Sequence, residues 1–148
     1  MRRRAAVLNL AAATAVAGLM LAGCGGTGSS LPPCVSPPPG IGPNAAGTLQ
    51  LEDKGKTICL KVGDELTVFL AVPITEESTR WGSIETSDAS VLEALNSGIL
   101  TLVRGVTGAV YQAHTRGVAQ LTSVRPPCEG LPANCSPDQV WQATIVVH

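Results

Sequence analysis

The chain has 148 residues, and its 10 Lys and Arg residues nearly balance its 11 Asp and Glu residues, so the formal net charge is −1. It contains only two Trp, one Tyr and one Phe, and its basic residues cluster only at Arg2–Arg4. Nucleic-acid binding, which needs a basic surface and often stacking rings, is therefore not expected. The length is sufficient for one domain with a hydrophobic core.

The first 24 residues have the pattern of an export signal. Arg2–Arg4 form a positive start, Ala5–Leu21 is an apolar run, and Leu-Ala-Gly precedes Cys24. This ending resembles a bacterial lipobox, which implies a diacylglyceryl group on the Cys24 thiol and cleavage that removes residues 1–23. The implied location is the extracytoplasmic face of the cell membrane, since two or three acyl chains hold a protein durably on a bilayer. An ordinary secretory signal or an uncleaved membrane helix is the alternative, and the export route, Sec or twin-arginine, stays open.

Residues 24–47 are expected to form a linker. The segment Gly25–Gly47 is rich in Gly, Pro and Ser and carries no charged residue, so it lacks the side chains that build a core. Its Gly-Ser start is typical of flexible chain and its Pro-Pro-Pro section of stiffer, extended chain. We expect this linker to hold a domain at 48–148 away from the membrane. A proline-rich ligand for another domain is the alternative.

With Cys24 assigned to lipid, four cysteines remain in an exported chain, where disulfides persist. Three pairings are possible, and we favour Cys34 with Cys59 and Cys128 with Cys135 because each bond closes a modest loop. Four cysteines could instead hold zinc, but the sequence has no C-x-x-C pair and no histidine beside a cysteine. The missing C-x-x-C pair also argues against redox catalysis. We therefore expect two disulfides, no metal and no other cofactor.

From residue 48 onward, short segments rich in Val, Leu, Thr and Ile are separated by Gly, Pro, Asp or Asn at intervals of about ten residues. This pattern predicts an all-β fold, an antiparallel β-sandwich of seven to eight strands. The expected strands are Thr57–Val62, Glu65–Val72, Arg80–Thr86, Val91–Leu95, Ile99–Arg104, Ala109–His114, Val118–Val124 and Val140–Val147. Glu65–Val72 should be central because both of its faces are largely apolar. Trp81 and Trp141 should fill the core, and Gly105–Gly108 should form a hairpin turn.

Two motifs in residues 48–148 resemble bacterial immunoglobulin-like domains. They are W-x6-D-x2-V-x-E, at Trp81, Asp88, Val91 and Glu93, and Y-x-A-x3-G-x-A-x-L, at Tyr111, Ala113, Gly117, Ala119 and Leu121. The resemblance implies an immunoglobulin-like sandwich. It does not define a task, because such domains occur in adhesins, envelope enzymes and spacers alike.

The order and spacing of the chain are also similar to chagasin-type inhibitors of papain-like cysteine proteases, which present three loops at one end of the sandwich. Alignment on Trp81 places their N-P-T-T-G loop at Ile74–Ser78, which shares one threonine and lacks the Asn-Pro and the Gly. Thr75, Glu76 and Glu77 would then face the protease. Two acidic side chains in place of small ones are costly to desolvate in a protease cleft.

The other two loops keep part of the inhibitor pattern. The G-x-G-G loop would fall at Gly105–Gly108, which keeps only the outer glycines, Gly105 and Gly108. The R-P-W/F loop would fall at Arg125–Pro127, which keeps Arg125 and Pro126 and has proline in place of the aromatic residue. That aromatic residue supplies contact area in the inhibitors.

No residue is expected to be catalytic. His114 ends a predicted strand, and the sequence places no nucleophile or acid near it. There is no G-x-S-x-G motif. His148 is the last residue and is expected to be mobile. Glu76, Glu77 and Asp88 do not form the alternating oxygen series of a calcium-binding loop.

The sequence thus favours a non-enzymatic, lipid-anchored binding or accessory protein of the cell envelope. It does not identify the envelope protein that would be its partner. The loops expected to meet a partner are Pro73–Thr79, Val103–Gly108 and Arg125–Pro137, because exposed loops on a rigid scaffold commonly carry binding sites. A chagasin-like protease inhibitor and a spacer without a specific ligand are the two alternatives.

Overall fold

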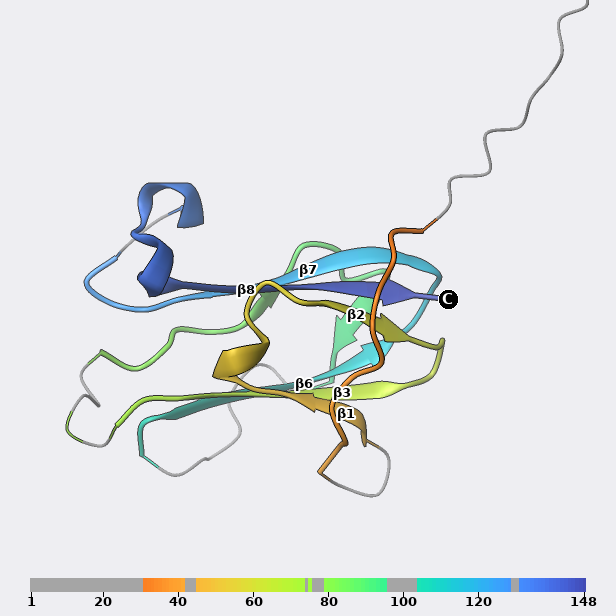
Figure 1. The fold of residues 1–148 in the computed structure, drawn as a ribbon, viewed down its shortest axis with the longest axis horizontal. Coiled ribbons are helices and arrows are strands. Elements are labelled where there is room, and N and C mark those ends of the chain that lie inside the picture. Colours follow the sequence, from red (N-terminus) through yellow and green to blue (C-terminus); the bar gives the residue numbers. More distant parts are fainter. Residues whose placement is uncertain (1–30, 42–44, 74, 76–78, 96–103, 129–130) are drawn as a thin grey trace, which may run out of the picture.

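The computed structural model describes residues 31–41, 45–73, 75, 79–95, 104–128 and 131–148. Two four-stranded sheets, with the strand orders β1-β3-β6-β5 and β2-β8-β7-β4, pack face to face in this part of the chain (Figure 1). The strands are β1 (Ala45–Leu49), β2 (Thr57–Leu60), β3 (Glu65–Ala71), β4 (Glu85–Thr86), β5 (Leu92–Ala94), β6 (Val106–Ala113), β7 (Gly117–Val124) and β8 (Val140–Val147). Short 3-10 helices are η1 (Leu51–Asp53), η3 (Pro132–Asn134) and η4 (Pro137–Gln139).

The predicted all-β sandwich is confirmed, but its sheets are mixed and not purely antiparallel. β1 pairs with β3 in parallel and β2 pairs with β8 in parallel, whereas the other strand pairs are antiparallel. Parallel neighbours cannot be joined by a tight hairpin. Neither β1 nor β2 is joined to its parallel neighbour by such a hairpin. Between β1 and β2 the chain crosses from one sheet to the other through η1, and each of the two strands lies at the edge of its sheet.

Alternating side chains fill the space between the sheets. In β3, Leu66, Val68 and Leu70 are fully buried, and β3 lies between β1 and β6, in the central position expected for it. Trp81 is 3% exposed and Trp141 is fully buried, as predicted. Because the chain has so few aromatic residues, these two indoles supply much of the volume that a close-packed core requires.

The segment before β4 and the turn before β6 differ from the prediction. Only Glu85–Thr86 of the expected strand Arg80–Thr86 pairs regularly with β7. A single further hydrogen bond, from Gly82 N to Val124 O at 2.8 Å, joins the earlier part of this segment to the end of β7. In Gly105–Gly108, only Gly105 belongs to a turn, with φ of +79°, and Gly108 lies inside β6 opposite Phe69. The expected strand Ile99–Arg104 lies almost entirely outside the described residues.

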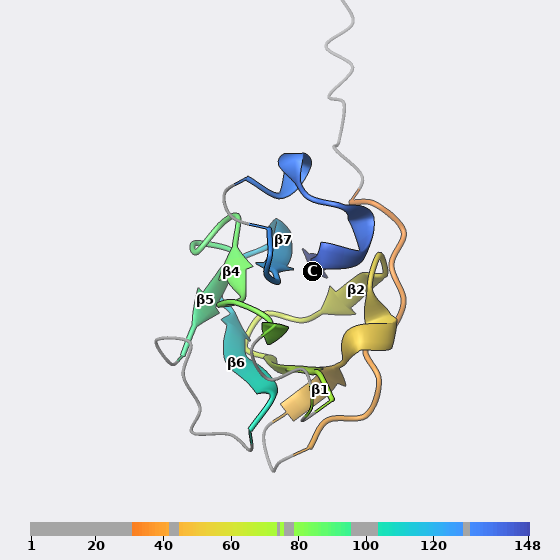
Figure 2. The same cartoon turned by 90° about the vertical axis from the view of Figure 1, so that its left-hand side faces the viewer.

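Residues 31–41, here called the strap, pack along the open side of the sandwich formed by the edge strands β1 and β2 (Figure 2). At β2, Val35 N donates to Thr57 O at 2.9 Å and Val35 O accepts from Cys59 N at 2.8 Å. At β1, Pro38 O accepts from Thr48 N at 3.2 Å. The strap therefore pairs polar groups of both edge strands, which would otherwise be templates for aggregation.

The expected linker 24–47 thus overlaps the folded domain. A disulfide joins Cys34 of the strap to Cys59 of β2, and β1 begins at Ala45, before residue 48. A side chain at Gly47 would collide with Pro37, so glycine at this position permits the close approach of strap and strand. Composition alone hides this packing, because Pro and Gly are typical both of linkers and of tight edge contacts.

No helix in the described ranges is long and apolar enough to cross a membrane. Cys24 and the expected export signal lie outside those ranges. The second disulfide joins Cys128 to Cys135, so both bonds follow the pairing that the loop lengths favour.

Removing the strap disulfide should destabilise the protein more than removing the other one. The Cys34–Cys59 bond spans 25 residues and the Cys128–Cys135 bond spans 7. In the chain-entropy account, the corresponding serine pairs should lower the free energy of unfolding by about 3 and about 2 kcal/mol. Urea unfolding of both double variants measures this difference, and a larger loss in the Cys128/Cys135 variant would contradict the role given to the strap.

Tyr111 connects the two sheets through a buried hydrogen bond. Its side chain is 1% exposed, and its hydroxyl donates to Ile84 O, next to β4, at 2.6 Å. Burial, with a smaller contribution from the charge of Glu85, raises the pKa of Tyr111 to about 12. The phenol is therefore held neutral in the folded state.

This shift predicts a loss of stability in strong base. Above about pH 10 an unfolded tyrosine releases its proton while Tyr111 in the folded protein keeps it, so the unfolded state binds fewer protons and the free energy of unfolding falls by up to about 2–3 kcal/mol. The fall should extend from about pH 10 to about pH 12. Urea unfolding of the wild type and of Tyr111→Phe checks it. The variant should lose about 1 kcal/mol at neutral pH and fall less steeply in base; equal slopes would refute the assignment.

Candidate functional site

Three chain segments meet at one end of the sandwich, here called the loop end. They follow β3, precede β6 and follow β7, and they lie at the left of Figure 1, away from the labelled C-terminus. Val72 N donates to Gly105 O at 2.9 Å, which joins the first segment to the second. Gly82 N donates to Val124 O at 2.8 Å, which joins the first to the third. The loop end is therefore one connected surface in the described residues.

Trp81 is the centre of the loop end. Its carbonyl oxygen accepts a hydrogen bond from Thr107 Oγ1 at 2.6 Å, which fixes it to β6. The Arg125 guanidinium lies over its ring, 5.8 Å from the ring centroid. A cation in that position is attracted to the negative face of the indole. Trp81, in the first segment, is thus linked through its backbone to the second segment and through its ring to Arg125 of the third.

Arg125 is held from two sides. Besides its contact with Trp81, its NH2 group donates to Thr79 Oγ1 at 3.3 Å. Ser123, just before it, donates from Oγ to Gly82 O at 2.9 Å. These contacts fix the backbone and the half-buried guanidinium, so little conformational freedom remains at this position.

The indole Nε1 of Trp81 is buried and has no hydrogen-bond acceptor among the described residues. Most buried polar groups in proteins are paired. Within the described part of the loop end, Trp81 therefore acts through its volume and its ring face, and not through its N–H group.

The outer surface of the loop end is formed by small, polar and proline residues. Pro73, Thr75, Arg104 and Pro126 are exposed. Beside them lies a shallow hollow of about 250 Å³ that is lined by Gly82, Ser83, Glu85, Thr122, Ser123, Val124 and Pro132. The Cys128–Cys135 disulfide closes the loop from which Pro132 comes. The loop end therefore presents exposed proline and polar residues and a small hollow with one carboxylate, that of Glu85, in its lining.

The sequence-predicted loop residues are only partly brought together. Thr75, Gly105, Arg125 and Pro126 lie at the loop end, with Gly105 buried and Arg125 half-buried. Gly108 is buried inside β6, opposite Phe69, and does not belong to the loop in which it was expected. The alternation of β6 continues through residues 106–108 because they pair with β3 as far as Ala71. Glu76 and Glu77 lie outside the described residues.

The candidate catalytic and calcium positions have structural roles. His114 lies in the exposed turn after β6, at the end of the sandwich away from the loop end, and its backbone N–H donates to Val91 O at 2.9 Å. The Asp88 carboxylate accepts from Ser90 N at 2.9 Å and from Ser90 Oγ at 2.6 Å. These hydrogen bonds, the one from the serine hydroxyl first, lower the pKa of Asp88. The carboxylate thus closes the turn before β5.

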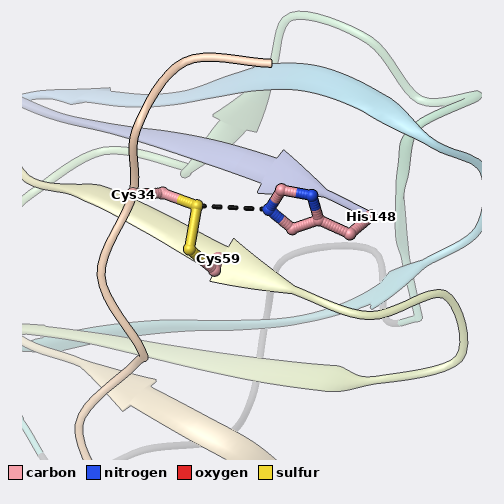
Figure 3. Close-up of side chains that lie close together, drawn as sticks. All are labelled: Cys34, Cys59 and His148. Atoms are coloured by element: carbon pink, nitrogen blue, oxygen red, sulfur yellow. Dashed lines mark hydrogen bonds between the residues drawn. A yellow bond between two sulfur atoms is a disulfide. The ribbon is translucent and has the colours of Figure 1, made fainter. Parts of the chain in front are cut away.

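A second group of residues was not found by sequence reasoning. The His148 imidazole lies beside the Cys34–Cys59 disulfide, with its Nε2–H donating to Cys34 Sγ at 3.3 Å (Figure 3). His148 is also held by its backbone, since its N–H donates to Leu60 O at 2.9 Å, so the expectation that it is mobile is wrong. The parallel pairing of β2 with β8 brings these residues together. The spacing of these three residues along the sequence does not predict that they lie together.

The sandwich is similar to solved structures that include a cysteine protease inhibitor. The crystal structure of the inhibitor EhICP2 from Entamoeba histolytica aligns at a TM-score of 0.52 and 11% identity, over 68% of this chain and 93% of that one. The solution structure of amebosin aligns at 0.42 and 13% identity, over 72% and 100% of the two chains. The structure of PbICP-C in complex with falcipain-2 aligns at 0.37 and 13%, over 73% and 93%. The alignment with EhICP2 shows a shared fold.

Comparison of the sequence with known families and proteins does not assign this chain to a family. No protein-family model matches the chain, and no curated protein matches it. At these identities the structural likeness establishes the architecture, while function has to be argued from the loop end.

Removing the Thr107 hydroxyl should loosen the loop end. Thr107→Val keeps the shape of the side chain but leaves the Trp81 carbonyl without the donor seen in the structure. We expect a loss of about 1–2 kcal/mol in the free energy of unfolding and a change in tryptophan fluorescence. Thr122→Val, on the neighbouring sheet, is the control because no hydrogen bond is seen for its hydroxyl among the described residues. Equal losses in the two variants would contradict the role of Thr107.

Proposed function

We propose that this protein inhibits papain-family cysteine proteases by placing its loop end in the active-site cleft. The observation that carries the proposal is the convergence on Trp81 of the three segments that the resemblance to chagasin-type inhibitors assigns to protease contact. The similarity of the sandwich to a cysteine protease inhibitor supports the same architecture. A rigid sandwich that presents prearranged loops loses little entropy on binding.

Arg125 and Pro126 are the residues proposed to make the central contact of the third loop. Arg125 is fixed by Trp81 and Thr79, and Pro126 beside it is exposed. Pro127 is also exposed and stands where the inhibitor pattern has an aromatic residue. The contact area of that loop is therefore smaller than the pattern provides.

The acidic first loop favours a second candidate. Glu76 and Glu77 replace small residues of the inhibitor pattern, and burying two carboxylates without partners is costly. The second candidate is a binding or accessory domain whose partner is another envelope protein with basic groups opposite these carboxylates. The two functions use the same loop end and differ in the partner.

We also propose that the protein acts outside the cytoplasm on a lipid anchor at Cys24. The lipobox-like ending Leu-Ala-Gly-Cys supports this location, and two disulfides are typical of exported proteins. Mass spectrometry of the protein from a bacterial membrane fraction tests it. Acylation at Cys24 supports the anchor, and an unmodified chain that begins elsewhere refutes it.

The first test of inhibition is a titration of papain with the full chain carrying Cys24→Ser, in detergent and with both disulfides confirmed by intact mass. We expect inhibition at concentrations of about 1 μM or lower. Arg125→Ala should weaken it by about tenfold or more because an arginine at the centre of an interface is a frequent hot spot. Arg116→Ala, in the exposed turn away from the loop end, is the control and should leave inhibition unchanged.

Substitutions in the acidic first loop should make the protein a stronger inhibitor. Glu76→Thr combined with Glu77→Thr should strengthen papain inhibition by about tenfold or more, because two charges no longer have to be desolvated. Glu93→Thr, at an exposed position of β5, is the matched control. If neither the parent chain nor the double variant inhibits papain, the inhibitor proposal is abandoned in favour of the accessory domain.

A further inference from the structure

Three side chains with metal-binding atoms meet at the end of the sandwich away from the loop end. Cys34 comes from the strap, Cys59 from β2 and His148 from the residue after β8 (Figure 3). Their two Sγ atoms and a ring nitrogen all lie within 4.8 Å of one another. The cysteines are half-buried and His148 is exposed. In the disulfide form the sulfurs are bonded to each other, and they are weak ligands.

The backbones that carry these residues are fixed by contacts other than the disulfide. β2 pairs with β8 so that Cys59 lies opposite Val146. His148 N donates to Leu60 O at 2.9 Å, and Cys59 N donates to Val35 O at 2.8 Å. Breaking the S–S bond therefore leaves the three side chains on supports that still hold them near one another.

We propose that the reduced form of this protein binds Zn²⁺ through Cys34, Cys59 and His148. A thiol or phosphine reductant supplies two electrons, two protons complete the two thiols, and the S–S bond breaks. Zn²⁺ then displaces both thiol protons and binds two thiolates and one neutral imidazole nitrogen. Two Cys and one His with a fourth position open to water is an established zinc ligand set.

The geometry requires only small movements. In a tetrahedral site, two sulfurs at about 2.3 Å from zinc lie about 3.8 Å apart, and a sulfur and a nitrogen lie about 3.5 Å apart. His148 Nε2 already lies 3.3 Å from Cys34 Sγ. The Cα atoms of the two cysteines are 5.2 Å apart, so rotation of the two side chains can separate the sulfurs without a shift of β2.

The site is also accessible. A hollow of about 440 Å³, lined by Pro33, Cys34, Val35, Lys56 and Thr57, opens beside Cys34. Lys56, the cation in its wall, is paired with Asp53 at 2.7 Å, so its charge is partly compensated. His148 is exposed to solvent, so a hydrated cation can reach its imidazole directly. Bound zinc would hold the strap to β2 in place of the disulfide, and this inference does not depend on the function of the loop end.

The test uses the full chain with Cys24, Cys128 and Cys135 replaced by serine, so that Cys34 and Cys59 are the only thiols. After reduction with a phosphine under argon, Co²⁺ is added as a spectroscopic substitute for Zn²⁺. We expect one equivalent to give the visible absorption of tetrahedral cobalt with thiolate ligands, and Zn²⁺ to displace it. The oxidised sample of the same chain should give no such absorption.

His148→Gln and His114→Gln are the matched variants. Loss of a residue that only orients a metal ligand typically weakens metal binding by about 10–100-fold. His148→Gln removes a ligand itself, so it should weaken binding by more than this. His114→Gln changes a residue in the turn after β6 and should bind metal as the parent does. Equal binding by the two variants would overturn the assignment of His148.

Circular dichroism with and without Zn²⁺ covers the case in which the reduced chain loses its fold. Zinc should then restore the sheet signal, because ligands that assemble only in the folded state couple binding to folding. No cobalt absorption from a folded reduced chain, or no recovery of an unfolded one, would overturn the proposal.

Discussion

The burial of Trp81 between the sheets is the constraint on which both the core and the loop end depend. Its side chain is 3% exposed, and its backbone carbonyl is bound by Thr107 of the opposite sheet. Arg125 lies over the same ring. A large buried indole contributes on the order of several kcal/mol through apolar burial. Because that free energy fixes the position of the ring, it also fixes the later part of the segment after β3 and the guanidinium of the segment after β7.

The core could be predicted from sequence because its signal is local. In β3 and β8, alternating apolar residues are enough to indicate which side chains face inward, and Leu66, Val68 and Trp141 are buried as expected. The strap could not be predicted in this way. Its contacts are carbonyl groups of Val35 and Pro38 that bind edge strands, and a backbone acceptor leaves no pattern of side chains in the sequence.

Residues of the candidate site could be predicted only where they belong to a short sequence motif. Arg125 and Pro126 were marked by the resemblance, whereas the partners of Arg125, Thr79 and Trp81, come from a segment more than forty residues earlier. The same limit applies to His148, which reaches Cys34 across 114 residues of sequence. Such contacts follow from strand pairing. The parallel pairing of β2 with β8 involves no hairpin turn, so no turn sequence predicts it.

The two ends of the sandwich are therefore fixed by separate means. At the loop end, Trp81 and Arg125 hold the segments through packing and side-chain hydrogen bonds, while at the other end a disulfide and backbone pairing hold the strap. No contact among these links is shared between the two ends in the residues described. Substitutions in the loops can thus alter a binding surface without disturbing the edge strands, and a sandwich of this kind can keep its fold at 11% identity while its loops diverge.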